Sequence, residues 1–312
     1  MNKDVWITGG RGFIGRHLAR ELADRGRTVH ALGHGAWLDD ERQACGVTGW
    51  LNASVTAASL DALGIRFGVP GAVYHLAGGA SVGASLAAPR DDFSRTVEAT
   101  SELVEWIRTR APDVPVVAVS SAAVYGDAWT TPIPVTAAPS PHSPYGAHKA
   151  AMESLLVGHA RSFGLRVAIV RLFSVYGPGL EKQLIWDLCC RLAAGGDTLS
   201  LGGCGDEQRD FLYVADAVAM LAAAESAANR EPAIFNGGTG RACTVRELAE
   251  TLTRLWPARV ALQFDGVRRP GDPRNLVADM NGSDVLATGT ATSVAAGLQQ
   301  TIASFRARMG LA

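Results

Sequence analysis

Short runs of apolar residues recur through the first half of the chain and alternate with segments whose apolar positions follow helical spacing. Each run is bounded by glycine, proline or polar residues, which is typical of buried strands. The predicted strands are 5–8, 28–32, 72–76, 115–120 and 167–171. Helical patterns lie between them, such as Phe13–Arg25, which ends at Gly26, and Phe93–Arg110, which Pro112 follows. This alternation predicts a parallel sheet covered on both faces, a doubly wound α/β fold of the Rossmann type.

The pattern changes after Arg171, where loop-rich segments carry shorter helical patterns. These helices are predicted at 184–194, 216–228 and 245–256. We therefore expect a dinucleotide-binding domain at 1–171 and a smaller α/β substrate-binding domain at 172–312. Residues 232–236, PAIFN, predict one late strand that returns to the main sheet.

A strand, a glycine turn and a helix start follow one another in residues 5–15, VWITGGRGFIG. Glycines in this pattern let the backbone turn sharply, approach a pyrophosphate and pack the helix against the sheet. The helix start supplies partly positive N–H groups, so the segment predicts a dinucleotide site, with a ligand-free glycine turn as the alternative. The residues predicted to contact the cofactor here are Gly9, Arg11, Gly12, Phe13, Ile14 and Gly15.

The second strand ends without the acidic residue that dinucleotide sites usually place there to bind the adenosine ribose. The chain has Gly33-His34-Gly35 at this point. Arg11 and His34 would attract a 2′-phosphate, which a carboxylate would repel. The sequence therefore favours NADP(H), and NAD(H) is the alternative because Arg11 can also point to solvent.

Three segments are predicted to form one reactive centre. They are SSAAVYG at 120–126 after a strand, YGAHK at 145–149 at the start of a helix, and the glycine loop. A hydride that moves to or from a carbon bearing oxygen requires a proton to move at that oxygen. Tyr145 is the predicted acid and base, and Lys149, one helical turn further on, would favour its phenolate. Ser121 would hydrogen-bond the substrate oxygen and orient it toward Tyr145.

These motifs resemble the extended short-chain dehydrogenase/reductase family, specifically its nucleotide-sugar epimerases, dehydratases and 4-keto reductases. The similarity continues in RLFSVYGPG at 171–179, RDFLYV at 209–214 and RPGD at 269–272. It implies that Leu76, Ala77 and Gly78, at the end of a strand, contact the cofactor together with Tyr145 and Lys149.

The same resemblance implies that the substrate is a nucleotide-diphosphate sugar. Arg209 and Arg269 correspond to arginines that grip the diphosphate in the family, and guanidinium groups suit that task because they pair with phosphate in a bidentate way. Ser121 and Ser174 are expected to contact the sugar. The resemblance also implies a homodimer, formed through helices such as Phe93–Arg110 and Tyr145–Phe163.

The chain departs from the family pattern in three places. Ala122 and Ala123 stand where 4,6-dehydratases and related decarboxylases usually carry an acidic residue, which disfavours 4,6-dehydration. Thr96 and Ser174 replace asparagines of the family, although both can still form hydrogen bonds.

Charge and cysteine content exclude several classes of protein. The 29 basic and 30 acidic residues nearly cancel, so we expect no binding to nucleic acid or to an anionic membrane. The five cysteines form no CxxC pair, which argues against a disulfide framework and a zinc site. The histidines, His148 among them, show no ligand spacing; we expect them to be structural or exposed, and no metal to bind. With neither a secretion signal nor a membrane-spanning stretch, the sequence predicts a cytoplasmic protein.

The sequence therefore predicts an NADPH-dependent reductase of a nucleotide-linked 4-keto sugar, a prediction that depends on Arg11 and Gly33. The first alternative is a C4 epimerase, which uses the same three residues, retains its cofactor and returns the hydride to the other face of the sugar. The second is a non-catalytic cofactor-binding regulator built on the same fold. The complete set of Ser121, Tyr145 and Lys149 argues against that reading.

Overall fold

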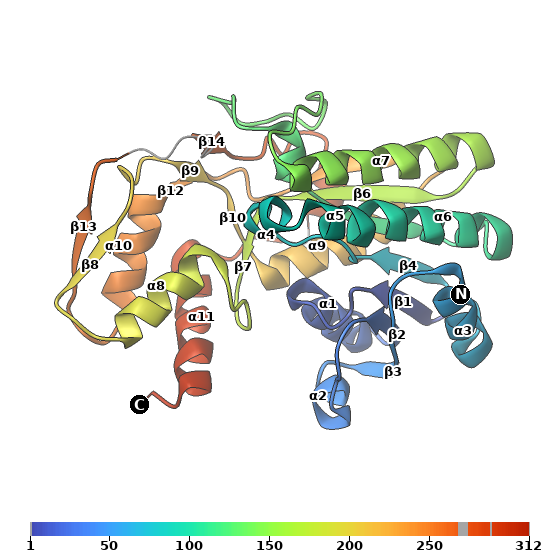
Figure 1. The fold of residues 1–312 in the computed structure, drawn as a ribbon, viewed down its shortest axis with the longest axis horizontal. Coiled ribbons are helices and arrows are strands. Elements are labelled where there is room, and N and C mark those ends of the chain that lie inside the picture. Colours follow the sequence, from blue (N-terminus) through green and yellow to red (C-terminus); the bar gives the residue numbers. More distant parts are fainter. Residues whose placement is uncertain (1, 268–273, 288, 312) are drawn as a thin grey trace.

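The computed structural model describes residues 2–267, 274–287 and 289–311. One end of the molecule is a sheet between helices, and the other is a smaller group of helices and short strands near the C-terminus (Figure 1). Among the described residues, no helix combines the length and the apolar character needed to cross a membrane.

Seven parallel strands form the main sheet in the order β11-β6-β5-β4-β1-β2-β3. They are β1 (Asp4–Thr8), β2 (Thr28–Gly33), β3 (Val47–Asn52), β4 (Ala72–His75), β5 (Val116–Ser121), β6 (Val167–Leu172) and β11 (Ala233–Gly237). The strand order reverses between β1 and β4, which opens a crevice at the carboxyl ends of these strands. The predicted Rossmann-type α/β fold is confirmed.

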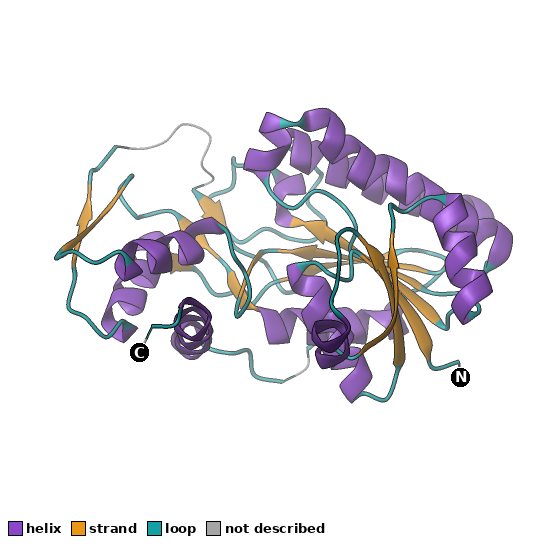
Figure 2. Cartoon of the chain, turned by 60° about the horizontal axis from the view of Figure 1, so that its bottom comes forward, coloured by secondary structure: helices purple, strands orange, loops and turns teal. Residues whose placement is uncertain are grey.

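Helices cover both faces of this sheet (Figure 2). Val5 and Ile7 pack on one side with α1 (Phe13–Asp24) and α9 (Val214–Ala227), whereas Trp6 packs on the other. The helices on the second side are α3 (Ala57–Phe67), α6 (Ala99–Arg110) and α7 (Pro144–Phe163), and α2 (Asp39–Ala44) connects β2 to β3. Because both faces are covered, the strands are apolar throughout rather than alternating.

The connection from β4 to α6 differs from the single helix expected at 93–110. It consists of α4 (Val82–Ala87), α5 (Pro89–Phe93) and a π-helical turn, η1 (Ser94–Glu98). Apolar periodicity does not reveal a π-helical turn, and such turns are frequent at functional sites. Another short helix, η2 (Ala122–Tyr125), follows β5.

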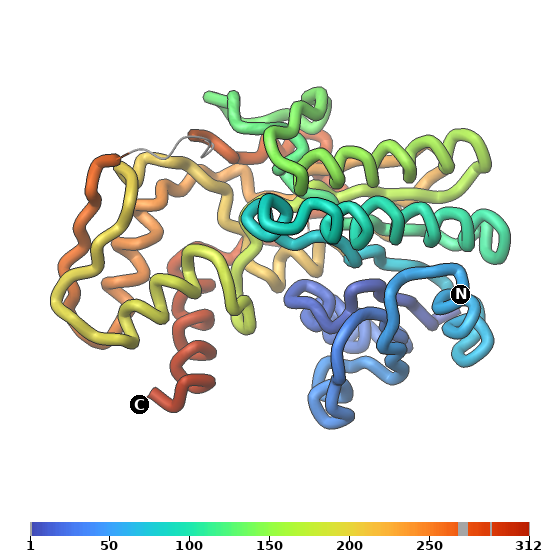
Figure 3. Tube along the Cα trace, viewed as in Figure 1, coloured from blue at the N-terminus to red at the C-terminus, as the bar shows by residue number. Residues whose placement is uncertain are grey.

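The rest of the chain builds the smaller part of the molecule, with α8 (Gln183–Ala193), α10 (Val245–Leu255), α11 (Val294–Met309) and η3 (Asp284–Leu286). Its strand groups are β7 (Ser174–Tyr176) with β10 (Phe211–Tyr213), β8 (Thr198–Leu201) with β13 (Ala261–Phe264), and β9 (Gln208–Arg209) with β12 (Cys243–Thr244) and β14 (Asn275–Leu276). The chain path in Figure 3 returns to the main sheet for α9 and β11. The late strand expected near 232–236 is β11.

Candidate active site

A cavity of about 1150 Å³ opens at the carboxyl ends of β1, β4 and β5. Its wall contains Ser121, Tyr145 and Lys149. The residues predicted to contact a cofactor lie in the same wall: Gly9, Arg11, Gly12, Phe13, Ile14, Gly15, His34, Leu76, Ala77 and Gly78. Segments far apart in the sequence therefore meet in one site.

The glycine loop has the geometry of a pyrophosphate cradle. Gly9 has a left-handed φ of 72°, and its N–H donates to the carbonyl of Leu32 at 2.7 Å. A Cβ at Gly15 would lie 2.5 Å from the carbonyl oxygen of Gly9, so α1 can approach the loop only with glycine there. No side chain among the described residues caps α1, which leaves its first N–H groups free to bind an anion.

Arg11 lies against the turn that follows β2. A Cβ at Gly35 would lie 2.5 Å from Nη1 of Arg11, and the N–H of Gly35 donates to Oδ1 of Asn52 at 2.9 Å. At the end of β2, a Cβ on Gly33 would approach the Trp50 ring at 3.1 Å. The indole therefore fills space that an acidic side chain would need at Gly33.

Tyr145 lies in the first turn of α7 and is held from two sides. Its backbone N–H donates to Oγ of the buried Ser85 at 3.1 Å, and Ser143 caps the helix by accepting from Gly146 at 3.2 Å. Burial raises the pKa of Tyr145, a hydrogen bond with Ser121 works in the opposite direction, and the carboxylate of Asp92 raises it further. Tyr145 therefore needs help from its surroundings to become a phenolate near neutral pH.

Lys149 is 3% exposed and lines the cavity. Its Nζ donates to the carbonyl of Val119 at 2.9 Å. Burial lowers the pKa of Lys149 to about 8, while the carboxylates of Asp92 and Glu153 oppose that change. A Cβ at Gly78 would lie 3.1 Å from Nζ, so the glycine keeps the ammonium group accessible from the cavity.

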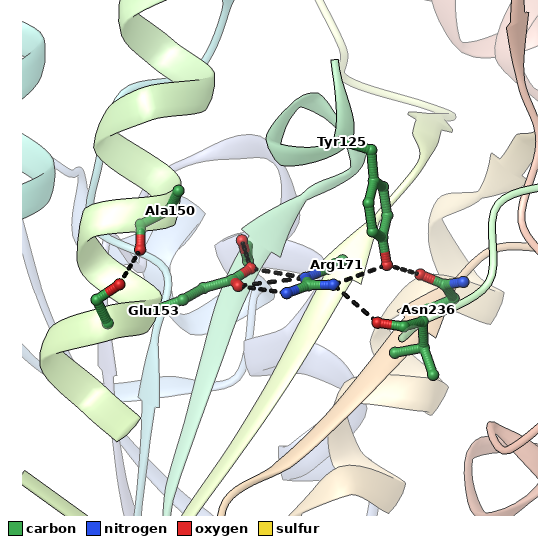
Figure 4. A network of polar contacts seen from close by, with 8 residues as sticks. Tyr125, Ala150, Glu153, Arg171 and Asn236 are labelled. Carbon is green, nitrogen blue, oxygen red and sulfur yellow. Dashed lines mark hydrogen bonds and ion pairs between the residues drawn. The ribbon is translucent and has the colours of Figure 1, made fainter. Parts of the chain in front are cut away.

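A buried polar network fixes α7 against the sheet (Figure 4). Arg171 of β6 donates through Nη2 and Nε to Glu153 of α7, at 2.7 and 2.9 Å, and Ser120 of β5 donates to the same carboxylate at 2.5 Å. Arg171 also donates to Oη of Tyr125 at 3.0 Å, and Tyr125 donates to Asn236 of β11 at 2.6 Å. This network fixes the helix that carries Tyr145 and Lys149.

Three polar residues beside the cavity, two of them buried and the third, His148, partly buried, were not predicted from the sequence as site residues. Thr96, in the π-helical turn, accepts the N–H of Gly79 at 2.8 Å. Asp92 and His148 form a pair with 2.6 Å between Oδ2 and Nδ1. The motif YGAHK does place His148 beside Lys149, but the sequence gives no sign of a partner on another helix.

The predicted substrate contacts lie toward the smaller part of the molecule. Arg209 lines a second cavity of about 330 Å³, and Ser174 lines both cavities. Lys182, which was not predicted, lines the larger cavity, and burial lowers its pKa. Arg269 lies outside the described residues.

Among the described residues, Glu98 and Glu102 are the acids that line the larger cavity. Glu102 accepts the N–H of Ala57 at 2.7 Å, and Glu98 accepts the hydroxyl of Ser94 at 2.6 Å. The wall directly after Ser121 is formed by Ala122 and Ala123. Glu98 also pairs with Arg90 of α5 at 3.4 Å, so the groups engaged by these two acids lie on α3, on α5 and on the π-helical turn. No group of three or more metal-ligating side chains occurs within the described ranges.

Comparison with known proteins gives the following matches. Residues 5–238 match the NAD dependent epimerase/dehydratase family. The chain is 31% identical over 296 residues to the UDP-glucose 4-epimerase of Azospirillum brasilense, covering 88% of this chain and 83% of that protein. The UDP-glucose 4-epimerase of Thermotoga maritima, solved with UDP-glucose, has a TM-score of 0.86 at 26% identity, covering 98% of this chain and 99% of that one. MoeE5, solved with UDP-glucuronic acid and NAD, has a TM-score of 0.84 at 31% identity and the same coverage.

Proposed function

The chain belongs to the NAD-dependent epimerase/dehydratase family, and from this premise we propose that it is a C4 epimerase of a nucleotide-linked sugar. The observation that carries the proposal is one cavity that combines a pyrophosphate cradle with Ser121, Tyr145 and Lys149. The named relatives from A. brasilense and T. maritima are UDP-glucose 4-epimerases, which supports epimerisation over the 4-keto reduction predicted first. Ala122 and Ala123 after Ser121 argue against a 4,6-dehydratase.

We propose NAD as the cofactor. When bound, it would take a hydride from the sugar carbon and return it. MoeE5 was solved with NAD, and the preference for NADP(H) expected from Arg11 and His34 has no support from this relative. The glycine loop and the uncapped start of α1 would hold the pyrophosphate, and Leu76, Ala77 and Gly78 would border the nicotinamide.

The three central residues would move the proton that accompanies the hydride. Tyr145 takes the proton from the sugar C4 hydroxyl as the hydride leaves C4, so that a C4 ketone forms. The ketone would then rotate so that the opposite face of C4 is turned toward the cofactor. The hydride would return to that face while the ketone oxygen takes the proton back from Tyr145. Lys149 stabilises the phenolate by its charge, and Ser121 orients the reacting oxygen.

The nucleotide sugar would extend from the larger cavity into the smaller one. Ser174 lines both cavities and would contact the sugar, while Arg209 and Arg269 would bind the diphosphate. Lys182 adds a cation on the side of the larger cavity. In this proposal, residues 172–312 supply most of the substrate contacts and residues 1–171 most of the cofactor contacts.

The test is an assay of the purified chain with UDP-glucose, UDP-galactose and UDP-glucuronic acid. We expect interconversion of C4 epimers with no net change in the absorbance of reduced nicotinamide. Tyr145→Phe should lower turnover by at least about 100-fold, because it removes the acid and base. Binding of NAD should persist in this variant.

Two outcomes would contradict the proposal. Stoichiometric oxidation of NADPH on addition of a nucleotide 4-keto sugar, without epimerisation, would establish the reductase. Cellular function that survives Tyr145→Phe unchanged would favour the non-catalytic regulator.

We also propose a homodimer formed through α6 and α7. These helices form an outer layer of the molecule, and Phe163 at the end of α7 is 53% exposed. Analytical ultracentrifugation should give twice the chain mass of 32.7 kDa. A monomer at micromolar concentration would contradict the dimer.

A further inference from the structure

A carboxylate and an imidazole form a partly buried pair beside the turn of α7 that carries Lys149. Asp92 on α5 is 5% exposed, and its Oδ2 lies 2.6 Å from Nδ1 of His148 on α7. The side chain of His148 is 17% exposed, and its ring packs edge-on against Phe93, with 5.4 Å between the centroids. The pair therefore joins α5 to α7 at the residue that precedes Lys149.

Asp92 and Lys149 approach neighbouring residues of one loop. A Cβ at Gly78 would lie 3.1 Å from Nζ of Lys149, and a Cβ at Gly79 would collide with Oδ1 of Asp92. Thr96 fixes this loop by accepting the N–H of Gly79. The buried ammonium group and the buried carboxylate thus lie next to consecutive glycines of the cavity wall.

The other charged and titratable groups near Lys149 are engaged or neutral. Glu153 is committed to Arg171, which donates to both of its oxygens, and to Ser120. His75 is fully buried between Thr8 and Thr100, and burial, aided by the charge of Lys149, lowers its pKa to about 3. Of the two carboxylates that act on Lys149 among the described residues, Asp92 is therefore the one not already neutralised by an arginine.

We propose that Asp92 and His148 form a charge-setting pair for the catalytic centre. Asp92 supplies the negative charge that keeps the buried Lys149 ammonium protonated, and His148 holds this carboxylate in place. Both are positioning residues, because they act through Lys149 and Tyr145 and do not line the cavity. The inference rests on the proposed function in one respect, namely the reaction in which Tyr145 and Lys149 take part.

The sign of the effect follows from the charge. A nearby negative charge favours the protonated form of any group, so it raises the pKa of Lys149 and that of Tyr145. Asp92→Asn removes the charge and keeps the size and a hydrogen bond to His148. Both pKa values should therefore fall, and both limbs of the pH–rate profile should move to lower pH. A purely structural role would lower turnover without moving both limbs together.

The experiment is a spectroscopic pH titration of tyrosinate in the NAD-loaded full chain, with the curve of Tyr145→Phe subtracted. The subtraction removes the signal of the other four tyrosines, whose pKa values burial also raises. We expect Asp92→Asn to move the Tyr145 curve to lower pH, because a nearby negative charge that favours the protonated phenol is lost. His148→Asn keeps the carboxylate and a hydrogen-bond donor, so its curve should match that of the wild type.

An Asp92→Asn protein with wild-type thermal stability and an unshifted curve would overturn the inference. If Asp92→Asn does not fold, Asp92→Ser is neutral and smaller and must give the same shift. The titration needs no turnover. A chain that converts no nucleotide sugar but shows the shift would therefore refute the proposed function and keep the charge-setting pair.

Discussion

Arg171 and Glu153 form an ion pair in which Nη2 and Oε2 lie 2.7 Å apart and the two side chains are 4% and 6% exposed. The pair joins β6 to α7 eight residues beyond Tyr145, and the Ser120 hydroxyl donates to the same carboxylate. Removing one partner of such a pair leaves the other charge buried without compensation. The geometry of the catalytic helix therefore depends on a contact that lies outside the cavity.

Glu153→Gln should lower the free energy of unfolding by about 3 kcal/mol, the lower end of the cost of breaking a buried pair. Chemical denaturation measures this change. The matched control is Glu231→Gln, which breaks the pair between Arg161 and Glu231; this pair is similarly short, at 2.6 Å, but its side chains are 62% and 72% exposed. The control should show no measurable loss, since solvent screens exposed pairs. Equal effects in the two variants would contradict the role assigned to the buried pair.

Gly15→Ala should weaken NAD binding by more than about tenfold, because a methyl group would collide with the carbonyls of Gly9 and Gly10 and displace α1 from the phosphate cradle. Fluorescence titration with NAD measures the loss. Gly158→Ala is the control: this helical glycine in α7 has open space around its Cα, so alanine should stabilise the chain by about 0.5 to 1 kcal/mol and leave NAD binding unchanged. Normal NAD affinity in Gly15→Ala would show that the loop adapts.

The local parts of the fold and site could be predicted from the sequence. The strand, glycine loop and helix at 5–15 and the pair Tyr145 and Lys149 lie within single segments, so spacing alone fixes their relative positions. Ser121 also joins them, because the carboxyl ends of parallel strands meet at one edge of the sheet.

The contacts between distant segments could not be predicted. The pair of Asp92 and His148 depends on how α5 docks on α7, and the π-helical turn at 94–98 has no distinct apolar period. The missing acid at Gly33 was visible in the sequence, but its physical reason, the ring of Trp50 on a neighbouring strand, was not. Because packing against Trp50 accounts for the missing acid, the gap at Gly33 does not by itself indicate NADP(H).

Burial lowers the pKa of Lys149 to about 8. Turnover should therefore decline as the pH rises through about 8. An ammonium group is charged below its pKa and neutral above it, so the phenolate of Tyr145 loses its stabilising charge on the alkaline side. Lys149→Arg keeps a charge at all accessible pH values and should turn over more slowly but without this decline. The measurement is kcat against pH for both proteins. If Lys149→Arg shows the same alkaline decline, the decline arises from the titration of another group.

Discrimination between NAD and NADP should be weak, because the end of β2 carries no carboxylate to repel a 2′-phosphate and Arg11 lies against the turn beyond it. Arg11→Ala should weaken NADP binding about tenfold, or about 1.4 kcal/mol, and change NAD binding by less than about twofold. Arg20→Ala is the matched control, since it removes the same charge from the outer face of α1, where Arg20 pairs with Asp24. Equal losses for both cofactors in Arg11→Ala would place the guanidinium on the shared pyrophosphate. Loss of neither would mean that Arg11 serves only the turn at Gly35, and the absence of an acid at Gly33 would then have no bearing on cofactor choice.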